Sequence, residues 1–419
     1  MDVILTRQEI TFESLLLAEN SIAFTKKVDR RYSNEFAQNG AKIGYTLNLR
    51  KNARSVSTSG QGIQLQDYIE RFVPLTLNKQ YQQAWSFTSS DRALSLDDFS
   101  KRVLKPKVAK IANDVDYDGM QQFQYVYNEV GTPGTVPNTS DTYLAAMQRL
   151  QEEGAPMDDD LSVVITPLQN RNIFPALQGL ITNTAGTASL GYLQSLAKGE
   201  GGRNDYLKGF VTRALGMDFF TSQNTPTFTT GTQGGTPVVN AAGQTGSSIT
   251  SSGWTDSTLV LNEGDVITFA GVYAVNPMTY QSTGALRQFV VTAPVTSNGS
   301  GVATIPISCV DGDGITIAGP YQTVTASPAN NAAITVDGTT AVTSGRGILF
   351  HPEAFTFACA DLPLYDNQDT SERASDDEIG LSMRFWMQPD INTDRLLARL
   401  DLLGGWLTML PQFAVRIAS

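Results

Sequence analysis

Side chains that could perform catalysis are few in this chain of 419 residues. The single histidine, His351, is the only ordinary near-neutral base, and it directly precedes Pro352. No nucleophile elbow, Walker loop, H-E-x-x-H helix or G-x-G-x-x-G turn between a strand and a helix is present. A pair of carboxylates of the kind that glycosidases use remains an open alternative. Folding, and not the spacing of residues in the sequence, decides which carboxylates lie close together. The residues therefore indicate a protein that is not an enzyme, with no catalytic residue to name.

Metal-ligating patterns are equally weak. Asp158, Asp159 and Asp160 form a carboxylate run without the further spacing of a calcium loop, which is typical of a solvated turn. The sequence DGDG at 311–314 resembles the start of a calcium loop but lacks its later carboxylate, which favours a β-turn. Cys309 and Cys359 lack ligand-like spacing and are expected to be reduced and buried. We expect no metal and no cofactor.

The charge of the chain limits its partners. A formal net charge of −11 argues against a surface that grips nucleic acid as a whole. Two basic clusters are expected to be solvated or paired with acidic neighbours: Lys26, Lys27, Arg30 and Arg31, and then Lys101, Arg102, Lys105, Lys107 and Lys110. We predict neither a signal peptide nor a membrane span. Charged residues make up 17% of the chain, below the roughly 25% usual in soluble domains. Such a surface suits contact with copies of itself.

A helical spine is the element around which the remainder is arranged. Ser95 and Asp98 predict the start of a short helix, and Pro106 suits the first turn of a longer one that continues to Asn128. Apolar residues recur at helical spacing in the long helix: Val108, Ile111, Val115 and Phe123. We therefore expect one face of this helix to be buried.

Extended and helical segments flank the spine. A short helix is predicted over 6–21, and alternating runs over 43–49 and 72–87 predict a long two-stranded excursion. An isolated two-stranded ribbon is marginal in water, so this excursion must lean on its own chain or on a neighbour. After the spine, the pattern predicts a helix over 141–153, a buried strand over 161–166 and strand-like sequence over 210–220.

The composition changes between Thr221 and Gly345, where there is no lysine and one arginine, Arg287. Short β-rich runs separated by turn residues predict a small antiparallel barrel or sandwich: 258–261, 265–270, 287–293, 302–308, 314–318, 322–325 and 333–336. Larger apolar residues resume after Gly345, and strands are predicted over 379–387 and 406–417, the latter broken at Pro411. The β-rich region is therefore interpreted as an insertion into a host fold.

Three phrases, KPKVAKIANDVD, KGFVTRALGMDFFTSQ and GRGILFHPEAFTFACADLP, resemble the major capsid proteins of tailed bacteriophages. DVITFAGVYAVNP with ALRQFVVTA is similar to the inserted β-barrel of the podovirus coat-protein subgroup. The resemblance implies an α+β major-capsid fold with an inserted antiparallel β-barrel domain. Its implied parts are an N-terminal arm (1–36), an extended β loop (37–92), a peripheral domain with the spine helix (93–140), a first axial part (141–222), the inserted barrel (223–345) and C-terminal axial and peripheral strands (346–419).

The same resemblance implies the function. The chain would be a structural subunit that forms hexamers and pentamers of itself and assembles, with a scaffolding protein and a portal protein, into an icosahedral procapsid. The shell would enclose double-stranded DNA without sequence-specific contact and without a membrane. Assembly would take place in the cytoplasm of the host bacterium, and the mature protein would lie in the virion capsid.

Other classes remain open at this point. A cellular nanocompartment shell of the same fold would enclose protein instead of DNA. A surface-layer or adhesin-like binding protein would explain the Thr, Ser and Gly in the β-rich region, although no signal peptide is predicted. An enzyme would be revealed only by its activity.

Overall fold

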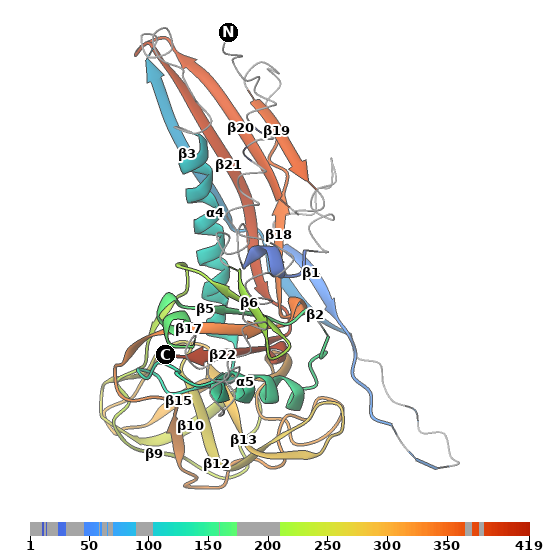
Figure 1. Ribbon diagram of the computed structural model, residues 1–419. Helices are drawn as coiled ribbons and strands as arrows, with labels where there is room; N and C mark the ends of the chain where they lie inside the picture. The colour runs from blue at the N-terminus through green and yellow to red at the C-terminus, as the bar shows by residue number, and fades with distance from the viewer. Residues whose placement is uncertain are drawn as a thin grey trace, which may run out of the picture. The chain divides into compact units, whose positions relative to one another are not determined.

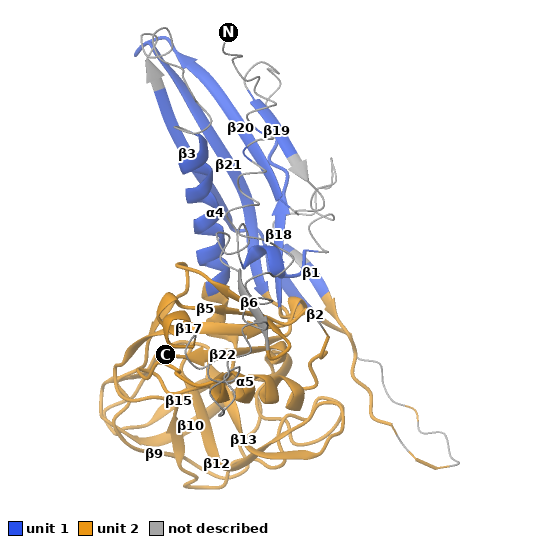
Figure 2. Ribbon diagram, viewed as in Figure 1, with its two compact units in different colours: residues 1–49, 72–120, 355–407 blue, residues 50–71, 121–354, 408–419 orange. Residues whose placement is uncertain are grey.

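The computed structural model describes residues 11, 14, 24–30, 46–57, 59–60, 65, 70–88, 104–158, 160–173, 210–364, 371–376 and 381–419. The chain forms two compact units, which Figure 2 distinguishes by colour. Unit 1 comprises residues 1–49, 72–120 and 355–407, and unit 2 comprises 50–71, 121–354 and 408–419. Within the described ranges, no helix combines the length and apolar composition that crossing a membrane requires.

The long helix of unit 1 is α4, Lys105–Met120, which lies alongside strand β3 (Figure 1). Its buried stripe includes Val108, Ile111 and Val115, as the apolar spacing predicts. The predicted continuation to Asn128 is wrong, because Gln121–Tyr125 is a 3-10 helix and the chain is no longer helical from Val126. Gly119 lies two residues before this 3-10 helix, and glycine is a weak helix former.

Unit 1 also contains an antiparallel sheet in the order β18-β21-β20-β19, with β3 paired to β21. The strands are β3 Lys79–Thr88, β18 Phe355–Ala360, β19 Ser371–Asp376, β20 Leu381–Asp390 and β21 Arg395–Thr408. Strand β3 matches β21 from Thr88 opposite Arg395 to Lys79 opposite Gly404. The predicted strand over 379–387 is confirmed from Leu381 onward as β20, and residues 379–380 lie outside the described residues.

The alternating run over 72–87 contributes to two sheets instead of one hairpin arm. Strand β2, Arg71–Thr76, pairs with β1, Thr46–Lys51, whereas β3 joins β21. Between β2 and β3, Leu77 is only 3% exposed. Alternation specifies which face of a strand is buried but not which strand it pairs with, so the sequence pattern could not reveal this division.

An N-terminal segment is attached to α4. Asp116, which is 1% exposed, accepts hydrogen bonds from the backbone N–H groups of Phe24 and Thr25 and from the Thr25 hydroxyl. The predicted helix over 6–21 lies outside the described residues, except for Thr11 and Ser14, which are helical. The predicted short helix from Ser95 also lies outside them.

The host sheet of unit 2 has the order β4-β22-β17-β5-β7-β6, and β8 also pairs with β17. Its strands are β4 Glu129–Val130, β5 Ser162–Ile165, β6 Phe210–Ala214, β7 Met217–Thr221, β8 Thr227–Thr229, β17 Thr343–Phe350 and β22 Ala414–Ala418. Helix α5, Asp141–Glu152, packs its Tyr143, Ala146 and Leu150 into the core of this sheet. Strand β17 pairs with β5, so segments on both sides of the β-rich region share one sheet.

The β-rich region forms a six-stranded sheet in the order β16-β12-β13-β15-β10-β9. Its strands are β9 Gly235–Val239, β10 Ser248–Trp254, β12 Val266–Val275, β13 Ser282–Val291, β15 Ala303–Ser308 and β16 Ile334–Val336. A bridge between Val238 and Ala333 nearly closes the sheet at its outer strands. A separate pair joins β11, Leu259–Leu261, to β14, Val295–Thr296. The buried core includes Phe269, Phe289 and Tyr127, the last from the segment after the spine.

Two of the predicted strands in this region are absent. Residues 314–318 and 322–325 form only isolated bridges, at Ile315 and Val324. The Thr323 hydroxyl donates to the carbonyl of Gly314 at 2.9 Å and accepts from the N–H of Thr316 at 2.9 Å. Because a side chain satisfies these backbone groups, no regular ladder forms between the two runs.

The packing of α4 makes a prediction about Gly119. A Cβ at this position would lie 2.5 Å from the Trp406 ring and 2.9 Å from the Phe24 ring. Overpacking costs about 1–3 kcal/mol, against a gain in helix propensity of about 1 kcal/mol. We therefore expect Gly119→Ala to lower the free energy of unfolding by up to about 2 kcal/mol in urea titrations. In a Trp406→Leu background the same change should cost less, and an equal cost in both backgrounds would contradict the packing argument.

Candidate functional site: a buried charge network

The only histidine contacts a carboxylate and a backbone N–H group. His351 Nε2 lies 3.1 Å from Asp158 Oδ2, and Nδ1 accepts the N–H of Glu353 at 3.4 Å. Both ring nitrogens are thus occupied, with no nucleophile among these partners. Asp158 serves as the partner of His351, and Asp160 donates its N–H back to Asp158. Asp159 lies outside the described residues.

The DGDG run places its carboxylates against cations of the same chain. Asp311 pairs with Arg54 at 2.7 Å, and the Asp313 carboxylate pairs with Arg71 at 2.5 Å. The predicted β-turn is a 3-10 turn, Val310–Gly312. Among the described residues, no group of three or more His, Cys, Asp or Glu side chains could hold a metal ion.

Both cysteines are free and buried, as predicted. Burial raises the pKa of the Cys309 thiol and of the Cys359 thiol to about 12. A thiol reacts as its thiolate, so neither cysteine is a nucleophile at neutral pH.

The basic clusters are surface features where the structure describes them. Lys110 pairs with Asp114 one turn along α4, and Lys107 lies 5.2 Å above the Trp85 ring. Lys26 and Lys27 close the short 3-10 helix Thr25–Lys27. Arg31, Lys101 and Arg102 lie outside the described residues.

A cluster of buried charges in unit 2 was not predicted. Glu129 of β4 is 4% exposed and lies between two arginines of neighbouring strands. Its Oε1 is 3.1 Å from Arg346 Nη2, and its Oε2 is 3.6 Å from Arg416 Nε. Arg416 also donates to the carbonyl of Gly264, in the β-rich region, at 2.7 Å. The host sheet and the β-rich region are thus joined through buried charge.

A second buried pair makes the same connection. Arg287, the only cation of the β-rich region, forms an ion pair with Glu153, which directly follows α5. It also donates to the carbonyls of Thr323 at 3.1 Å and Val275 at 2.9 Å. The Tyr127 hydroxyl donates to Glu153 at 2.9 Å, and burial holds the Tyr127 pKa well above its usual range. The guanidinium is therefore surrounded by acceptors from both segments.

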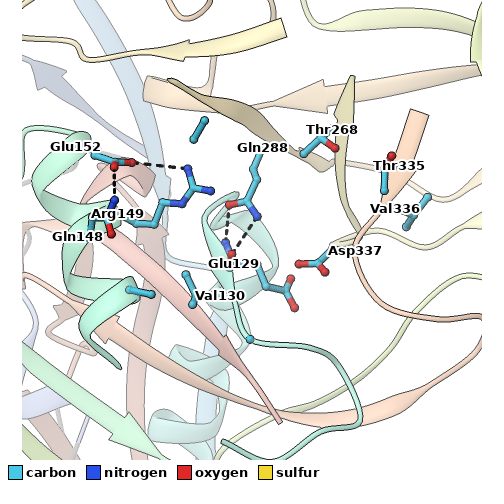
Figure 3. A pocket seen from close by; sticks show the side chains of 13 residues that line it. Glu129, Val130, Gln148, Arg149, Glu152, Thr268, Gln288, Thr335, Val336 and Asp337 are labelled. Atoms are coloured by element: carbon cyan, nitrogen blue, oxygen red, sulfur yellow. Dashed lines mark hydrogen bonds and ion pairs between the residues drawn. The ribbon is translucent and has the colours of Figure 1, made fainter. Parts of the chain in front are cut away.

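A groove of about 480 Å³ lies beside these pairs, and Figure 3 shows the side chains that line it. Gln288 of β13 closes one side by accepting the N–H of Glu129 at 3.0 Å and donating to its carbonyl at 2.9 Å. Asp337 lines the same groove. Burial, followed by the charge of Glu129, raises the pKa of Asp337 to about 6.

Asp265, next to the network, is 1% exposed. It accepts N–H bonds from Asn262 at 2.7 Å and from Gly231 at 3.0 Å. Burial raises its pKa to about 6 despite these bonds. The arrangement holds polypeptide segments together and presents no group poised for bond cleavage.

The sequence contained one signal for this network. Arg346 and Arg416 stand inside otherwise apolar strands, GRGILF and AVRIA, where a charge must find a partner if the strand is buried. The partners, Glu129 and Glu153, had no recognisable pattern, because their positions depend on how the sheets pack.

Comparison with known proteins agrees with the capsid interpretation. The sequence model of the family described as P22 coat protein, gene protein 5, matches residues 199–417, just over half of the chain. The matched range contains the β-rich region and the three buried arginines, Arg287, Arg346 and Arg416. No curated protein matches the chain.

Solved structures of phage capsids are also similar to the chain. The capsid of Ralstonia phage GP4 has 8% identity and a TM-score of 0.44, covering 100% of this chain and 92% of that chain. A chain of Mycobacterium phage Che8 has 10% identity and a TM-score of 0.43, covering 95% and 92%. The CUS-3 coat protein I-domain is 25% identical with a TM-score of 0.18, and covers 25% of this chain and 97% of that chain.

The family match confirms the predicted class. The chain belongs to the P22 coat protein family and is a structural, non-enzymatic major capsid protein that forms a homo-oligomeric shell in the virion capsid.

Proposed function

We propose that this coat protein assembles in the cytoplasm of a host bacterium, with a scaffolding protein and a portal protein, into the icosahedral procapsid of a tailed phage. Hexamers and pentamers of the chain form the shell, which encloses double-stranded DNA. The family match over 199–417 carries this proposal. The net charge of −11 also supports it, because an acidic shell does not trap the DNA by neutralising its phosphates.

The two-stranded ribbon supports contact between copies. Strands β1 and β2 form a sheet of two strands, which is marginal in water without a further partner. Leu65, in the loop between these strands, is 93% exposed, and Phe72 of β2 is 49% exposed. We assign the extended loop, 37–92, to contact with a neighbouring subunit, which would cover these apolar side chains.

For the β-rich region, 223–345, we propose the role of an inserted barrel of the podovirus type that aids folding and intersubunit contact. Its core takes in Tyr127, and its Arg287 reaches Glu153. A region that forms its own sheet and also binds both of these residues would hold the host segments close together. We also propose an N-terminal arm over 1–36, a peripheral domain with the spine helix over 93–140 and a first axial part over 141–222. The C-terminal axial and peripheral strands are proposed over 346–419.

Electron microscopy of the protein expressed with its scaffolding partner tests assembly. We expect closed, uniform shells tens of nanometres across, because a shell of that size can enclose a phage genome. A stable monomer with and without the partner would contradict the proposal. Shells purified from the native source that contain protein cargo and no nucleic acid would instead identify a nanocompartment.

Loss of one buried charge tests the connection between the β-rich region and the host. Arg287→Met leaves Glu153 buried without its cation, and breaking a buried pair in this way costs about 3–5 kcal/mol. We expect a loss of that order in the urea unfolding of the unassembled protein. The double variant Arg287→Met with Glu153→Gln removes both charges and should recover part of the loss. Equal stability of the single and double variants would show that the pair does not hold the segments together.

The buried carboxyl group of Asp265 predicts a pH dependence. Its pKa of about 6 lies above the value of an unfolded Asp, so the folded state binds more protons and stability falls as pH rises from 5 to 7. Asp265→Asn cannot ionise, so relative to the wild type it should gain roughly 1 kcal/mol over this range. Urea titrations at both pH values measure the difference.

A matched control is Asp390→Asn. Bonds from Thr393 and Asn392 hold the Asp390 pKa below its usual range, so this group does not titrate between pH 5 and 7. The control should therefore leave the slope unchanged. A D265N difference that is the same at both pH values would exclude a buried ionisation at Asp265.

A further inference from the structure

Three cations from residues 51–71 converge on one acidic turn of the β-rich region. Arg54 Nη2 lies 2.7 Å from Asp311 Oδ2, and Lys51 Nζ donates to the Asp311 carbonyl at 3.0 Å. On the returning side of the loop, Arg71 Nη1 lies 2.5 Å from Asp313 Oδ2. The two ends of this loop therefore meet at the same turn.

Two tyrosines make further contacts with the same loop. The guanidinium of Arg71 lies 3.5 Å from the centroid of the Tyr321 ring, and the backbone N–H of Arg54 donates to the Tyr321 hydroxyl at 3.4 Å. The Tyr280 hydroxyl lies 3.3 Å from the carbonyl of Ser55 and 3.1 Å from that of Pro320, and it can donate to either. The contacts thus fix backbone as well as side chains.

The turn is built to present its carboxylates. Asp311 has φ +57°, in the left-handed region that few non-glycine residues adopt, although Asp tolerates it better than most. Gln412 holds it from both sides, since its amide donates to Asp311 Oδ1 at 2.9 Å and accepts the Asp311 N–H at 3.2 Å. A strained residue is retained where its surroundings fix its conformation.

Composition explains why the cations come from this loop. Residues 221–345 contain no lysine and only Arg287, which is buried against Glu153. The acidic turn therefore cannot be neutralised from within its own region. The side chains of Lys51 and Asp311 are only 6% and 8% exposed, so these charges are shielded from solvent and weakly screened by salt.

We propose that this cluster is a clasp that fixes the direction of the loop between β1 and β2 relative to the β-rich region, and that the β-rich region thereby sets the geometry with which the loop meets a second copy of the chain. The clasp comprises Lys51, Arg54, Arg71, Asp311, Asp313 and Tyr321. Only the contact with a second copy rests on the proposed function. The fixed direction is a property of the single chain.

Distances between two spin labels test the clasp directly in the unassembled full-length protein. Ser57 and Ser300 are exposed, at the loop and in the β-rich region, and both are replaced by cysteine for labelling. Cys309 and Cys359 are buried, so the labels attach selectively. We expect one narrow distance distribution in this parent protein. Asp311→Asn with Asp313→Asn should broaden it at least twofold.

Two further variants complete the test. Arg71→Gln alters the loop without touching the β-rich region, and should also broaden the distribution. Arg50→Glu is the matched control, because Arg50 is 73% exposed and lies outside the clasp, with its Nη1 3.8 Å from the Glu70 carboxylate. Its distribution should stay narrow. A broad distribution in the parent, or a narrow one in both clasp variants, would overturn the proposal.

Microscopy of shells then tests the consequence for assembly. The clasp variants should give irregular or wrongly sized shells, whereas Arg50→Glu should give uniform ones. Uniform shells from variants with a broadened distribution would overturn the link between loop direction and assembly. Absence of shells from the parent would instead count against the proposed function, because the label distances do not depend on assembly.

Discussion

Unit 2 depends on the pairing of charges that have been removed from water. Among the described residues, the largest fully buried side chains are Arg287, Arg346 and Arg416. A buried guanidinium is tolerated only where carboxylates and carbonyls surround it. Those partners come from β4, from the end of α5 and from the β-rich region, so these segments must be in place together. Charge pairing therefore links the two sheets of unit 2.

Unit 1 is held by a different kind of contact. Strand β3 pairs with β21 along ten residues of backbone, and Gly119 of α4 lets the Trp406 ring approach the helix. Phe24 packs 5.5 Å from the same ring, and Asp116 holds the backbone beside it. Close packing and backbone ladders tolerate little change in volume. The stability of unit 1 therefore depends mainly on the volume of its packed side chains, whereas the stability of unit 2 depends on the pairing of its buried charges.

This division suits a protein whose partners are copies of itself. The chain carries few charges, and several of them are paired with one another inside unit 2, in the buried network and in the clasp. Surfaces with few charges lose less solvation when they meet one another. The clasp also connects the acidic β-rich region to the loop, so folding of that region and the direction of the loop are linked in one chain.

The sequence by itself determined the class and the local elements. Apolar spacing predicted the buried stripe of α4 and the helix at α5, and short β-rich runs predicted most strands of the β-rich region. Three short sequence segments indicated a phage capsid protein. The tertiary structure decided which elements pair: it divided the 72–87 run between two sheets, ended α4 at Met120, and brought Glu129 to Arg346 and Arg54 to Asp311. Local patterns report the burial of a residue against its neighbours in sequence. Ion pairs and strand partners join residues up to hundreds of positions apart, and only the packed chain specifies them.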